Sequence, residues 1–356
     1  MNYHDQMKQK CFDRINEIAE HLPAYAVSYV RAKATHKDTS YKTGMAYAYD
    51  LQVFFRYLEQ VKNVPIEKAT PAYLGSLTPS DIEEYLQYLV SFETDSDREY
   101  NQAARTEKRS PGTPPKRHHM AASARARNLS ALRGLYKHMI KNGLVKDNPA
   151  ALADTPKTQK KRIIRLDKDE VRQTLSNVES TEIQGMQRPQ FARRQALRDY
   201  ALLSLLLFTG IRVSECVGID LSDIDFTKNS VLVRRKGGDD ESVFFNQDVA
   251  DALQDYIRNE RYEPEYDPDA LFVSRRKERM STEAVENVVK KYTAGVSIHK
   301  ITPHKLRSTF ATQLYEVTND AMKVKDALGH KSLSVVQKYI DSAEQNRQEA
   351  AKDIHY

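Results

Sequence analysis

Apolar residues in the first 150 positions recur at steps of three and four, the spacing that places side chains on one face of a helix. One such face is formed by Met45, Ala48, Leu51, Phe55 and Leu58. A second helix is predicted over 82–89 with Ser80 as its N-cap, and a third over 129–139. The first part of the chain is therefore expected to be a helical domain whose core is built from these faces.

The helical spacing is lost between residues 93 and 118. The run Ser110-Pro111-Gly112-Thr113-Pro114-Pro115 falls here, and its prolines and glycine cannot continue a helix. We expect a long flexible loop inside the first domain. Its basic end is equally compatible with a nucleic-acid contact and with simple disorder.

The helical half ends at Asn148-Pro149, and the residues that follow are rich in lysine and arginine. Leu166 then precedes an Asp-x-x-Glu pattern, Asp167 to Glu170, which is typical of the capping box at the start of a helix. The chain therefore divides into a first domain, a basic linker and a second domain, with expected bounds 1–155, 156–165 and 166–356.

Two short β-type runs, Ser230–Arg234 and Ser242–Phe245, flank the polar stretch Lys236–Asp240 in the second domain. Such a pair predicts a hairpin with the polar stretch at its tip. Helical spacing resumes after the hairpin and continues to the end of the chain. The expected fold is mostly α-helical with a small β-sheet.

The cysteines and the apolar runs limit the class of protein. Cys11 and Cys216 lie far apart and in no metal-ligand spacing, which argues against a disulfide framework or a zinc site. Residues 1–10 are polar and lack the apolar core of a signal peptide. The apolar run from Ala201 to Phe208 is too short to span a bilayer. We expect a soluble, cytoplasmic protein that binds no metal.

Two arginines are candidates for holding an anion. Arg212 follows an apolar segment and Thr209-Gly210, a place where a guanidinium is usually partly buried and needs a partner. Glu215, three residues on, can hold it. Arg307 is the second candidate, although either arginine alone would ordinarily be a surface charge. Arginine suits a phosphodiester because its planar fork grips two oxygens and stays protonated.

Two histidines extend this set. His304 and Arg307 are spaced i, i+3, so one helical turn presents both on the same side, with Pro303 near the start of the helix. His330 follows Gly329 at a predicted helix boundary. A lone histidine on a helix is more often structural than catalytic, but its pairing with an arginine favours a shared phosphate.

Tyr339 and Lys236 are the candidates for the chemical step. Any one of the 20 tyrosines would ordinarily be a packing residue, but Tyr339 closely follows His330. A phenol becomes a nucleophile when cations and a proton acceptor surround it, and attack on phosphorus would give a 3′-phosphotyrosyl link without a metal or ATP. Lys236, at the predicted hairpin tip, could protonate the departing 5′-oxygen, with Arg235 and Lys228 as competitors.

Basic residues gather in two stretches of a chain whose formal net charge is +6. Either stretch alone is as easily explained by a solvated helix face. Two stretches beside a candidate phosphodiester site favour a nucleic-acid backbone, where lysines and arginines release counterions. The candidate contacts are Arg125, Arg127, Arg133, Lys137, Lys160, Lys161 and Arg162.

Three segments resemble the motifs of the tyrosine recombinase (phage integrase) family. Thr209–Glu215, with the sequence TGIRVSE, resembles the first arginine box. His304-x-x-Arg307 followed by Thr309–Thr312 resembles the second, and Leu328-Gly329-His330 with Tyr339 resembles the third. Within the family the chain resembles the Xer site-specific recombinases. Its length and its long loop are most similar to the single-recombinase XerS type.

The resemblance implies a set of residues around the scissile phosphate: Arg212, Lys236, His304, Arg307 and His330, with Tyr339 as nucleophile. It also implies a helical, SAM-like core-binding domain and a mixed α/β catalytic domain that close on DNA as a C-shaped clamp. The tail from Ser342 to Tyr356 resembles the segment that docks on a neighbouring subunit.

Partners and a biological role are also implied by the resemblance. The partners are double-stranded DNA at a specific site, further copies of the chain in a synaptic homotetramer, and a septal DNA translocase (FtsK-like). No cofactor is implied. The implied role is the resolution of chromosome dimers at a dif-like site during chromosome segregation and cell division.

Other roles fit the same residues. A mobile-element integrase would share the chemistry, although the small arm-binding domain that such enzymes often add is not evident before residue 20. A type IB topoisomerase would form the same link without synapsis, and a non-catalytic DNA-binding protein would form none. Nucleotide- and metal-dependent enzymes lose support because the chain has neither a Gly-x4-Gly-Lys-Ser/Thr loop nor His-Glu-x-x-His. One departure from many relatives is Ser308, where they carry a histidine after the second arginine.

Overall fold

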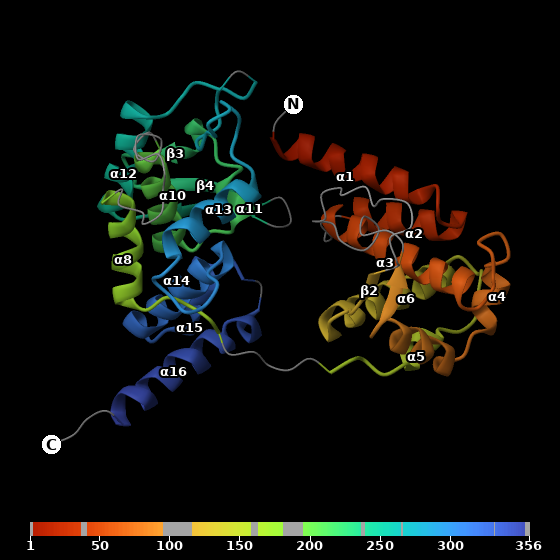
Figure 1. Ribbon diagram of the computed structural model, residues 1–356. Coiled ribbons are helices and arrows are strands. Elements are labelled where there is room, and N and C mark those ends of the chain that lie inside the picture. Colours follow the sequence, from red (N-terminus) through yellow and green to blue (C-terminus); the bar gives the residue numbers. More distant parts are fainter. Residues whose placement is uncertain are drawn as a thin grey trace. The chain divides into compact units, whose positions relative to one another are not determined.

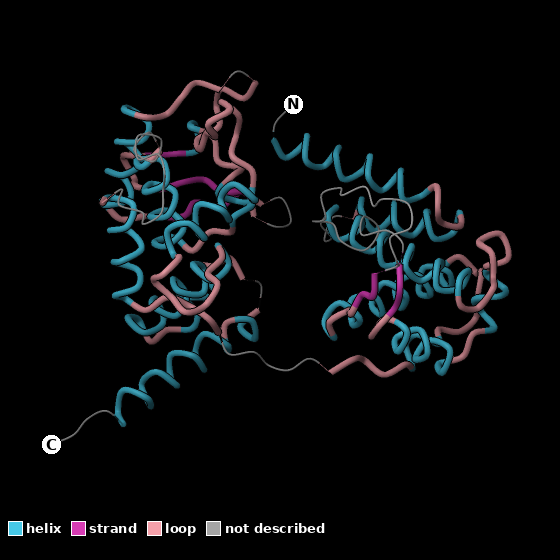
Figure 2. The backbone as a smooth tube through the Cα atoms, in the orientation of Figure 1, coloured by secondary structure: helices cyan, strands magenta, loops and turns pink. Residues whose placement is uncertain are grey.

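The computed structural model describes residues 3–36, 41–94, 116–157, 163–180, 195–235, 239–264, 266–330 and 332–352. The chain forms two compact units, Met1–Lys160 and Lys161–Tyr356, and helices make up most of each (Figures 1 and 2). The predicted fold class, mostly α-helical with a small β-sheet, is confirmed. Among the described residues, no helix has both the length and the apolar character that a membrane crossing needs.

The N-terminal unit is a set of helices with one short β-ribbon. Its helices are α1 (Tyr3–Ala19), α2 (Ala24–Thr35), α3 (Tyr41–Gln60), α4 (Pro71–Ser76), α5 (Pro79–Tyr88), α6 (Ala122–Lys141) and α7 (Pro149–Leu152). Strands β1 (Phe92–Thr94) and β2 (Lys116–His118) pair antiparallel. The ends of the predicted loop 93–118 are therefore strands, and residues 95–115 lie outside the described part of the chain.

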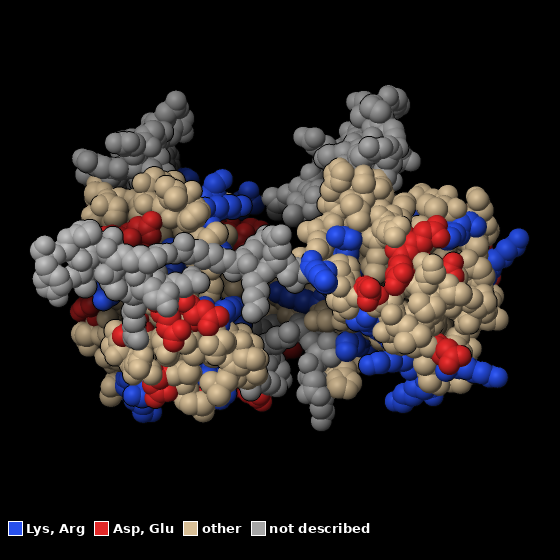
Figure 3. Space-filling model, turned by 90° about the horizontal axis from the view of Figure 1, so that it is seen from below, with Lys and Arg blue, Asp and Glu red and all other residues tan. Residues whose placement is uncertain are grey.

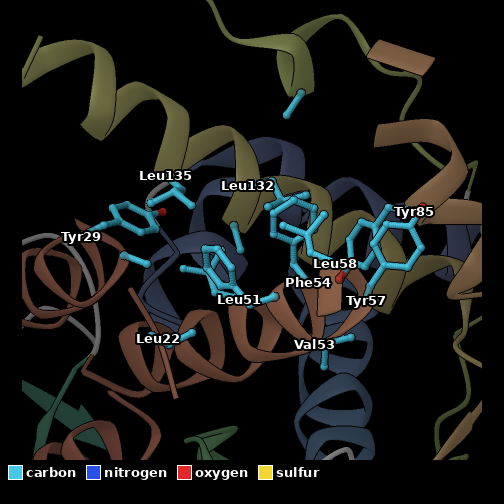
Figure 4. Close-up of a cluster of buried hydrophobic side chains, with 14 of the residues drawn as sticks. Leu22, Tyr29, Leu51, Val53, Phe54, Tyr57, Leu58, Tyr85, Leu132 and Leu135 are labelled. Atoms are coloured by element: carbon cyan, nitrogen blue, oxygen red, sulfur yellow. The ribbon is translucent and has the colours of Figure 1, made fainter. Parts of the chain in front are cut away.

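The core of this unit lies between α2, α3, α5 and α6, as the labelled side chains show (Figure 4). On α3, Ala48, Leu51, Phe55 and Leu58 are buried, and Met45 packs against the edge of the core. The predicted face of α6 is also buried, with no position more than 1% exposed; it consists of Leu129, Leu132, Tyr136 and Met139. The helical spacing therefore predicted both core faces correctly.

The helix predicted over 82–89 begins earlier than expected, and the prediction of Ser80 as its cap is wrong. α5 starts at Pro79, and its N-cap is Thr78, whose hydroxyl accepts a hydrogen bond from the Asp81 N–H at 3.3 Å. The Asp81 carboxylate accepts one from the Thr78 N–H at 2.8 Å. Proline fits the first position of a helix, so the cap must stand before Pro79 rather than after it.

The C-terminal unit contains the remaining helices and a three-stranded sheet. Its helices are α8 (Lys168–Glu179), α10 (Ala196–Thr209), α11 (Val213–Cys216), η1 (Leu221–Asp223), α12 (Gln247–Asn259), α13 (Thr282–Thr293), α14 (Pro303–Thr318), α15 (Ala321–Ala327), η2 (Leu333–Val335) and α16 (Gln337–Lys352). α10 is almost entirely buried because it packs against α8, α12 and α14 (Figure 1). The predicted capping box is confirmed, since Asp167 and Glu170 accept from each other's backbone N–H groups.

The predicted hairpin is confirmed and belongs to an antiparallel sheet of strand order β3-β4-β5, with β3 at Ile224–Asp225, β4 at Ser230–Arg234 and β5 at Asp240–Phe244. Ser230 pairs with Phe244 and Arg234 with Asp240. β5 begins two residues before the predicted run. Of the predicted tip, Lys236–Asp240, residues 236–238 lie outside the described part of the chain, and Asp240 already belongs to β5.

The residues after the linker attach to α14. The Leu166 N–H donates to the Thr309 hydroxyl at 2.9 Å, and Arg165 pairs with Glu316 at 3.3 Å. Leu166 is fully buried. The predicted linker 156–165 is thus partly held on the C-terminal unit, and residues 158–162 lie outside the described part.

Gly210 ends α10 in the left-handed conformation, with φ 64°. A Cβ added there would lie 2.3 Å from a ring carbon of Phe310 on α14. Glycine is therefore needed both for the backbone conformation and for the close approach of α10 to α14. This approach brings the segment with Arg212 against the helix that carries His304 and Arg307.

We expect Gly210→Ala to lower the free energy of unfolding by about 2–5 kcal/mol, because left-handed strain costs about 1–2 kcal/mol and overpacking about 1–3 kcal/mol. Gly295→Ala is the matched control, since Gly295 has φ 78° but no atom within 4 Å of an added Cβ. Urea unfolding of both variants measures the difference. Equal losses would mean that Phe310 moves aside without cost.

Candidate active site

Arg212 is held by Glu215 at the start of α11. Its Nη1 pairs with Glu215 Oε1 at 2.6 Å, and its backbone N–H donates to Glu215 Oε2 at 2.8 Å. The Glu215 carboxylate is buried, whereas the Arg212 side chain is 33% exposed. The carboxylate therefore fixes the guanidinium while part of it stays open to a ligand, as the i, i+3 spacing predicted.

Arg307 is buried on α14, where backbone carbonyls accept its hydrogen bonds. Its Nη1 donates to the Gly210 carbonyl at 2.5 Å, and its Nη2 donates to the Leu328 carbonyl at 2.6 Å. Within the described residues it forms no ion pair. Burial, and then the charge of Arg212, lower the pKa of Arg307 to about 10. Among the described residues its hydrogen-bond partners are two carbonyls and an imidazole, and a buried cation with such partners is well suited to receive an anion.

His330 contacts Arg307 through its ring. Its Nε2 lies 3.1 Å from Arg307 Nη2. Because a guanidinium can only donate, Nε2 must accept, which assigns the ring proton to Nδ1 in a neutral imidazole. Burial, and then Arg307 and Arg212, lower the pKa of His330 to about 4, in agreement with that assignment. His330 follows Gly329, whose φ of 59° ends α15.

His304 lies in the first turn of α14, directly after Pro303 at the first helical position, as predicted. Its side chain is more exposed than that of Arg307 on the next turn, although part of it is covered. Partial burial, followed by the charges of Lys338 and Arg307, lowers the pKa of His304. Both imidazoles are therefore neutral at pH 7 and can accept a proton.

Tyr339 stands near the start of α16 and is fully buried. Its ring lies nearly parallel to that of His330, with 6.4 Å between centroids and 19° between planes. Lys338 Nζ lies 4.7 Å from the centroid of the Tyr339 ring. Within the described residues the Tyr339 hydroxyl has no hydrogen-bond partner. The candidate nucleophile is thus beside the cationic cluster but shielded from solvent.

The structure brings together most of the predicted catalytic residues. Glu215 pairs with Arg212, and Arg307 contacts His330, whose ring lies beside that of Tyr339. Lys236 lies outside the described residues, so its place is untested. Of its competitors, Arg235 is buried between carboxylates and Lys228 pairs with Asp225 at 3.2 Å. Arg235 is therefore not free to act as a mobile proton donor, whereas the exposed Lys228 is engaged in a surface ion pair.

Two further positions bear on this cluster. The Ser308 hydroxyl donates to the His304 carbonyl at 3.1 Å and is buried, so the residue that departs from many relatives has a structural role here. Lys338 was not singled out from the sequence, where nothing but its adjacency to Tyr339 distinguishes it.

No group of three or more His, Cys, Asp or Glu residues in the described ranges could hold a metal ion.

Two of the predicted DNA contacts have partners inside the N-terminal unit. Arg127 pairs with the buried Asp50 through two hydrogen bonds of 2.8 and 2.9 Å. Arg133 donates to the carbonyls of Ala150 and Ala153, both at 2.8 Å. These bonds give both arginines a structural role.

The other candidates differ in their surroundings. Lys137 is exposed, and Arg125 is partly buried with an Nε that has no partner among the described residues. Lys160, Lys161 and Arg162 lie outside the described residues. On the face drawn in Figure 3, lysines and arginines form separate patches with acidic residues between them. The DNA contacts remain predictions.

The lowered pKa of His330 has a consequence for stability. Between pH 6.5 and 4 the folded protein binds fewer protons at this residue than the unfolded chain, so folding weakens as the pH falls through this window. On going from pH 7.5 to pH 5 the wild type should lose about 1–2 kcal/mol more than His330→Gln, after solvent screening. Urea unfolding at both pH values measures this, and equal losses would mean that His330 titrates at its ordinary pKa.

Comparisons with known proteins agree with this geometry. The sequence profile of the phage integrase family matches residues 164–346, just over half of the chain. The chain is similar to the tyrosine recombinase XerC of Leptospira interrogans, 26% identical over 340 residues that cover 95% of this chain and 94% of the relative. It is also similar to the tyrosine recombinase XerS of Streptococcus mutans, 27% identical over 362 residues that cover 93% and 95%.

A solved structure shares the fold. The XerH site-specific recombinase bound to palindromic difH substrate, in a post-cleavage complex, gives a TM-score of 0.62 at 20% identity, over 87% of this chain and 79% of that chain. The chain belongs to the phage integrase family and, with its Xer-type relatives, is a tyrosine recombinase, an enzyme of DNA strand exchange.

Proposed function

We propose that this recombinase cuts and rejoins DNA at a specific site through a 3′-phosphotyrosyl link on Tyr339, and that it resolves chromosome dimers at a dif-like site. The observation that carries the chemical part is the cluster of Arg212, Arg307, His330 and Tyr339 in one unit. Two guanidiniums, a neutral imidazole and a phenol come together there, and all derive from segments that the sequence spacing predicted.

The guanidiniums are the proposed ligands of the scissile phosphate. Arg307 has no carboxylate partner among the described residues, and Arg212 is held by a buried carboxylate while a third of its side chain stays exposed. Negative charge develops on the non-bridging oxygens during phosphoryl transfer, and fixed donors in a buried site stabilise it. A phosphate would therefore supply the counter-charge that Arg307 lacks.

The proposed cleavage step keeps the energy of the phosphodiester bond in the link between Tyr339 and the DNA. The Tyr339 oxygen attacks phosphorus, and the P–O5′ bond breaks as the Oη–P bond forms. The phenolic proton passes to the neutral His304, and Lys236 protonates the departing 5′-oxygen. A 5′-hydroxyl from another strand then attacks the phosphotyrosine and gives its proton to the neutral Lys236. The Oη–P bond breaks as the new P–O5′ bond forms, and His304 returns its proton to Tyr339, so rejoining requires no ATP.

The burial of Tyr339 adds a condition to this step. Tyr339 belongs to a buried cluster with Leu328, Val336 and Ala311, and its hydroxyl is itself buried. The oxygen must leave this enclosure to meet a phosphate. We infer that DNA binding moves the start of α16, and that the DNA-free chain holds its nucleophile out of reach.

The expected number of protein copies follows from the number of DNA strands that are cut. Exchange between two duplexes cuts four strands, and each cut requires one tyrosine, so four copies of the chain are the expected synaptic unit. The site bound by the related XerH protein, difH, supports a dif-like target. A target on the chromosome places the enzyme in the cytoplasm, with a septal FtsK-like translocase as the proposed activator.

Recombination on a plasmid tests this function. A supercoiled plasmid with two directly repeated copies of the candidate chromosomal site should yield two circles with the purified protein. Relaxed topoisomers without new circles would indicate a topoisomerase instead. In cells, loss of the gene should give chromosome dimers only where homologous recombination is active. If cells without the gene form no dimers, a mobile-element integrase would be favoured.

The basic linker makes a separate prediction. Replacing Lys160, Lys161 and Arg162 with glutamine should weaken binding to any DNA sequence and flatten the slope of log K against log salt by about 0.9 for each phosphate that the linker no longer neutralises. Lys228→Gln is the control, since Lys228 pairs with Asp225. An unchanged slope in the triple variant, measured by fluorescence anisotropy, would contradict binding of the linker to DNA.

A further inference from the structure

Arg235 is a buried arginine at the base of the hairpin. Its side chain is 7% exposed, and it directly precedes Lys236 in the sequence. Its backbone N–H donates to the Asp239 carbonyl at 2.8 Å, which closes the two strands below the tip. The side chain turns inward and meets three other segments of the C-terminal unit.

The first contact is with the residue that holds Arg212. Arg235 Nη1 donates to Glu215 Oε2 at 3.0 Å, and the same oxygen accepts the backbone N–H of Arg212 at 2.8 Å. Arg212 Nη1 bonds the other oxygen, Oε1. One buried carboxylate is therefore fixed between two guanidiniums, and its orientation depends on both.

The second contact is with β5, and the third is with the turn that leads to His330. Arg235 donates to Glu241 from Nε at 3.0 Å and from Nη2 at 3.2 Å, and Nη2 also reaches the Ala327 carbonyl at 3.3 Å. A Cβ added to Gly329 would lie 2.8 Å from Arg235 Nε. The turn before His330 thus packs directly on the Arg235–Glu241 pair.

These contacts distinguish Arg235 from a substrate ligand. Burial alone would lower its pKa, but the carboxylates of Glu241 and Glu215 outweigh burial, and the pKa of Arg235 is raised. Its charge is already compensated, whereas that of Arg307 is not. The neighbouring Arg234 does not share this role, because it is exposed and its ion pair among the described residues is with Asp240 on the strand opposite.

We propose that Arg235 is a positioning residue, whose guanidinium ties the Arg212–Glu215 pair, the base of the Lys236 hairpin and the His330 turn into one arrangement around the phosphate. This inference rests on the proposed function. It adds to it a residue that touches neither the substrate nor the reacting atoms, and that sets the geometry of groups from three separate segments.

The test uses full-length Arg235→Met, Arg235→Lys and Glu241→Gln, with Arg234→Met as matched control. Single-turnover formation of the covalent adduct on a nicked duplex is measured with DNA affinity and melting temperature. We expect Arg235→Met to form the adduct 10- to 100-fold more slowly with Kd within threefold of wild type. Arg235→Lys should recover part of the rate, and Arg234→Met should stay within twofold.

A pH profile separates positioning from a merely structural role. Arg235 is one of the charges that lower the pKa of His330. Its loss should raise that pKa and shift the acid limb of the rate profile to higher pH. A reduced adduct amplitude with an unchanged rate constant and pH profile would mean only a smaller folded fraction, and would overturn the inference. Wild-type rates in both Arg235→Lys and Glu241→Gln would overturn it as well, even if Arg235→Met failed to fold.

The wild-type protein keeps the two proposals distinguishable. If wild type forms no adduct on its recombination site, the proposed function fails and the role of Arg235 fails with it. If wild type forms the adduct and the Arg235 variants match it in rate and pH profile, only the positioning role is overturned.

Discussion

Tyr339→Phe is expected to form no covalent adduct with a nicked duplex carrying the recombination site, whereas the wild-type protein accumulates one. The phenylalanine ring keeps the apolar packing in the cluster around α16 but removes the oxygen that is proposed to attack phosphorus. Binding should be unchanged. Because the hydroxyl is buried and has no partner among the described residues, its removal should leave stability equal or raise it by about 1 kcal/mol.

Denaturing gels after incubation with labelled DNA measure the adduct, and thermal melting measures stability. Tyr315→Phe is the matched control, since Tyr315 is a buried tyrosine of the same cluster. It should form the adduct at the wild-type rate. An adduct that persisted in Tyr339→Phe would assign the nucleophile to another residue, and peptide mapping of the adduct would identify it.

Arg307→Ala should slow single-turnover cleavage by about 100- to 1,000-fold, since one preorganised donor to a developing oxyanion contributes on that scale. Affinity for the site should change much less, because many backbone contacts share the binding of DNA. The substitution also leaves the carbonyls of Gly210 and Leu328 without their donor, which costs about 1–3 kcal/mol for each. Rate, affinity and unfolding must therefore be measured on the same preparation.

Two additions isolate the contribution of Arg307 to the chemical step. Arg307→Lys keeps a charge without the planar fork, and it should remain well below the wild-type rate. Methylguanidinium added to Arg307→Ala should restore part of the cleavage rate by filling the vacated space. A parallel loss of stability and affinity, with an unchanged rate for the protein that binds, would instead make Arg307 structural.

The features predicted from the sequence are those fixed by local spacing. The α3 and α6 faces follow from the helical period, and the cap at Asp167 follows from a four-residue pattern. The ribbon of β1 and β2 was not predicted, because three-residue strands show no alternation and their partners are separated by the segment 95–115. The cap of α5 lies two residues before the predicted Ser80, because Pro79 occupies the first position of the helix.

The candidate site likewise combines residues that the sequence predicts with roles that it does not predict. Motif spacing pointed to Arg212, Arg307, His330 and Tyr339, and the fold brings them together. The roles of Arg127 and Arg235 depend on partners remote in the sequence, such as Asp50, 77 residues away from Arg127. The burial of Tyr339 was likewise unpredictable, since it results from the packing of α16 against α14.

The attachment of the linker to α14 has a mechanical consequence. Leu166 and Arg165 bind Thr309 and Glu316, and the first turns of the same helix carry His304 and Arg307. A displacement of Arg165 or Leu166 would therefore act on the helix that carries His304 and Arg307.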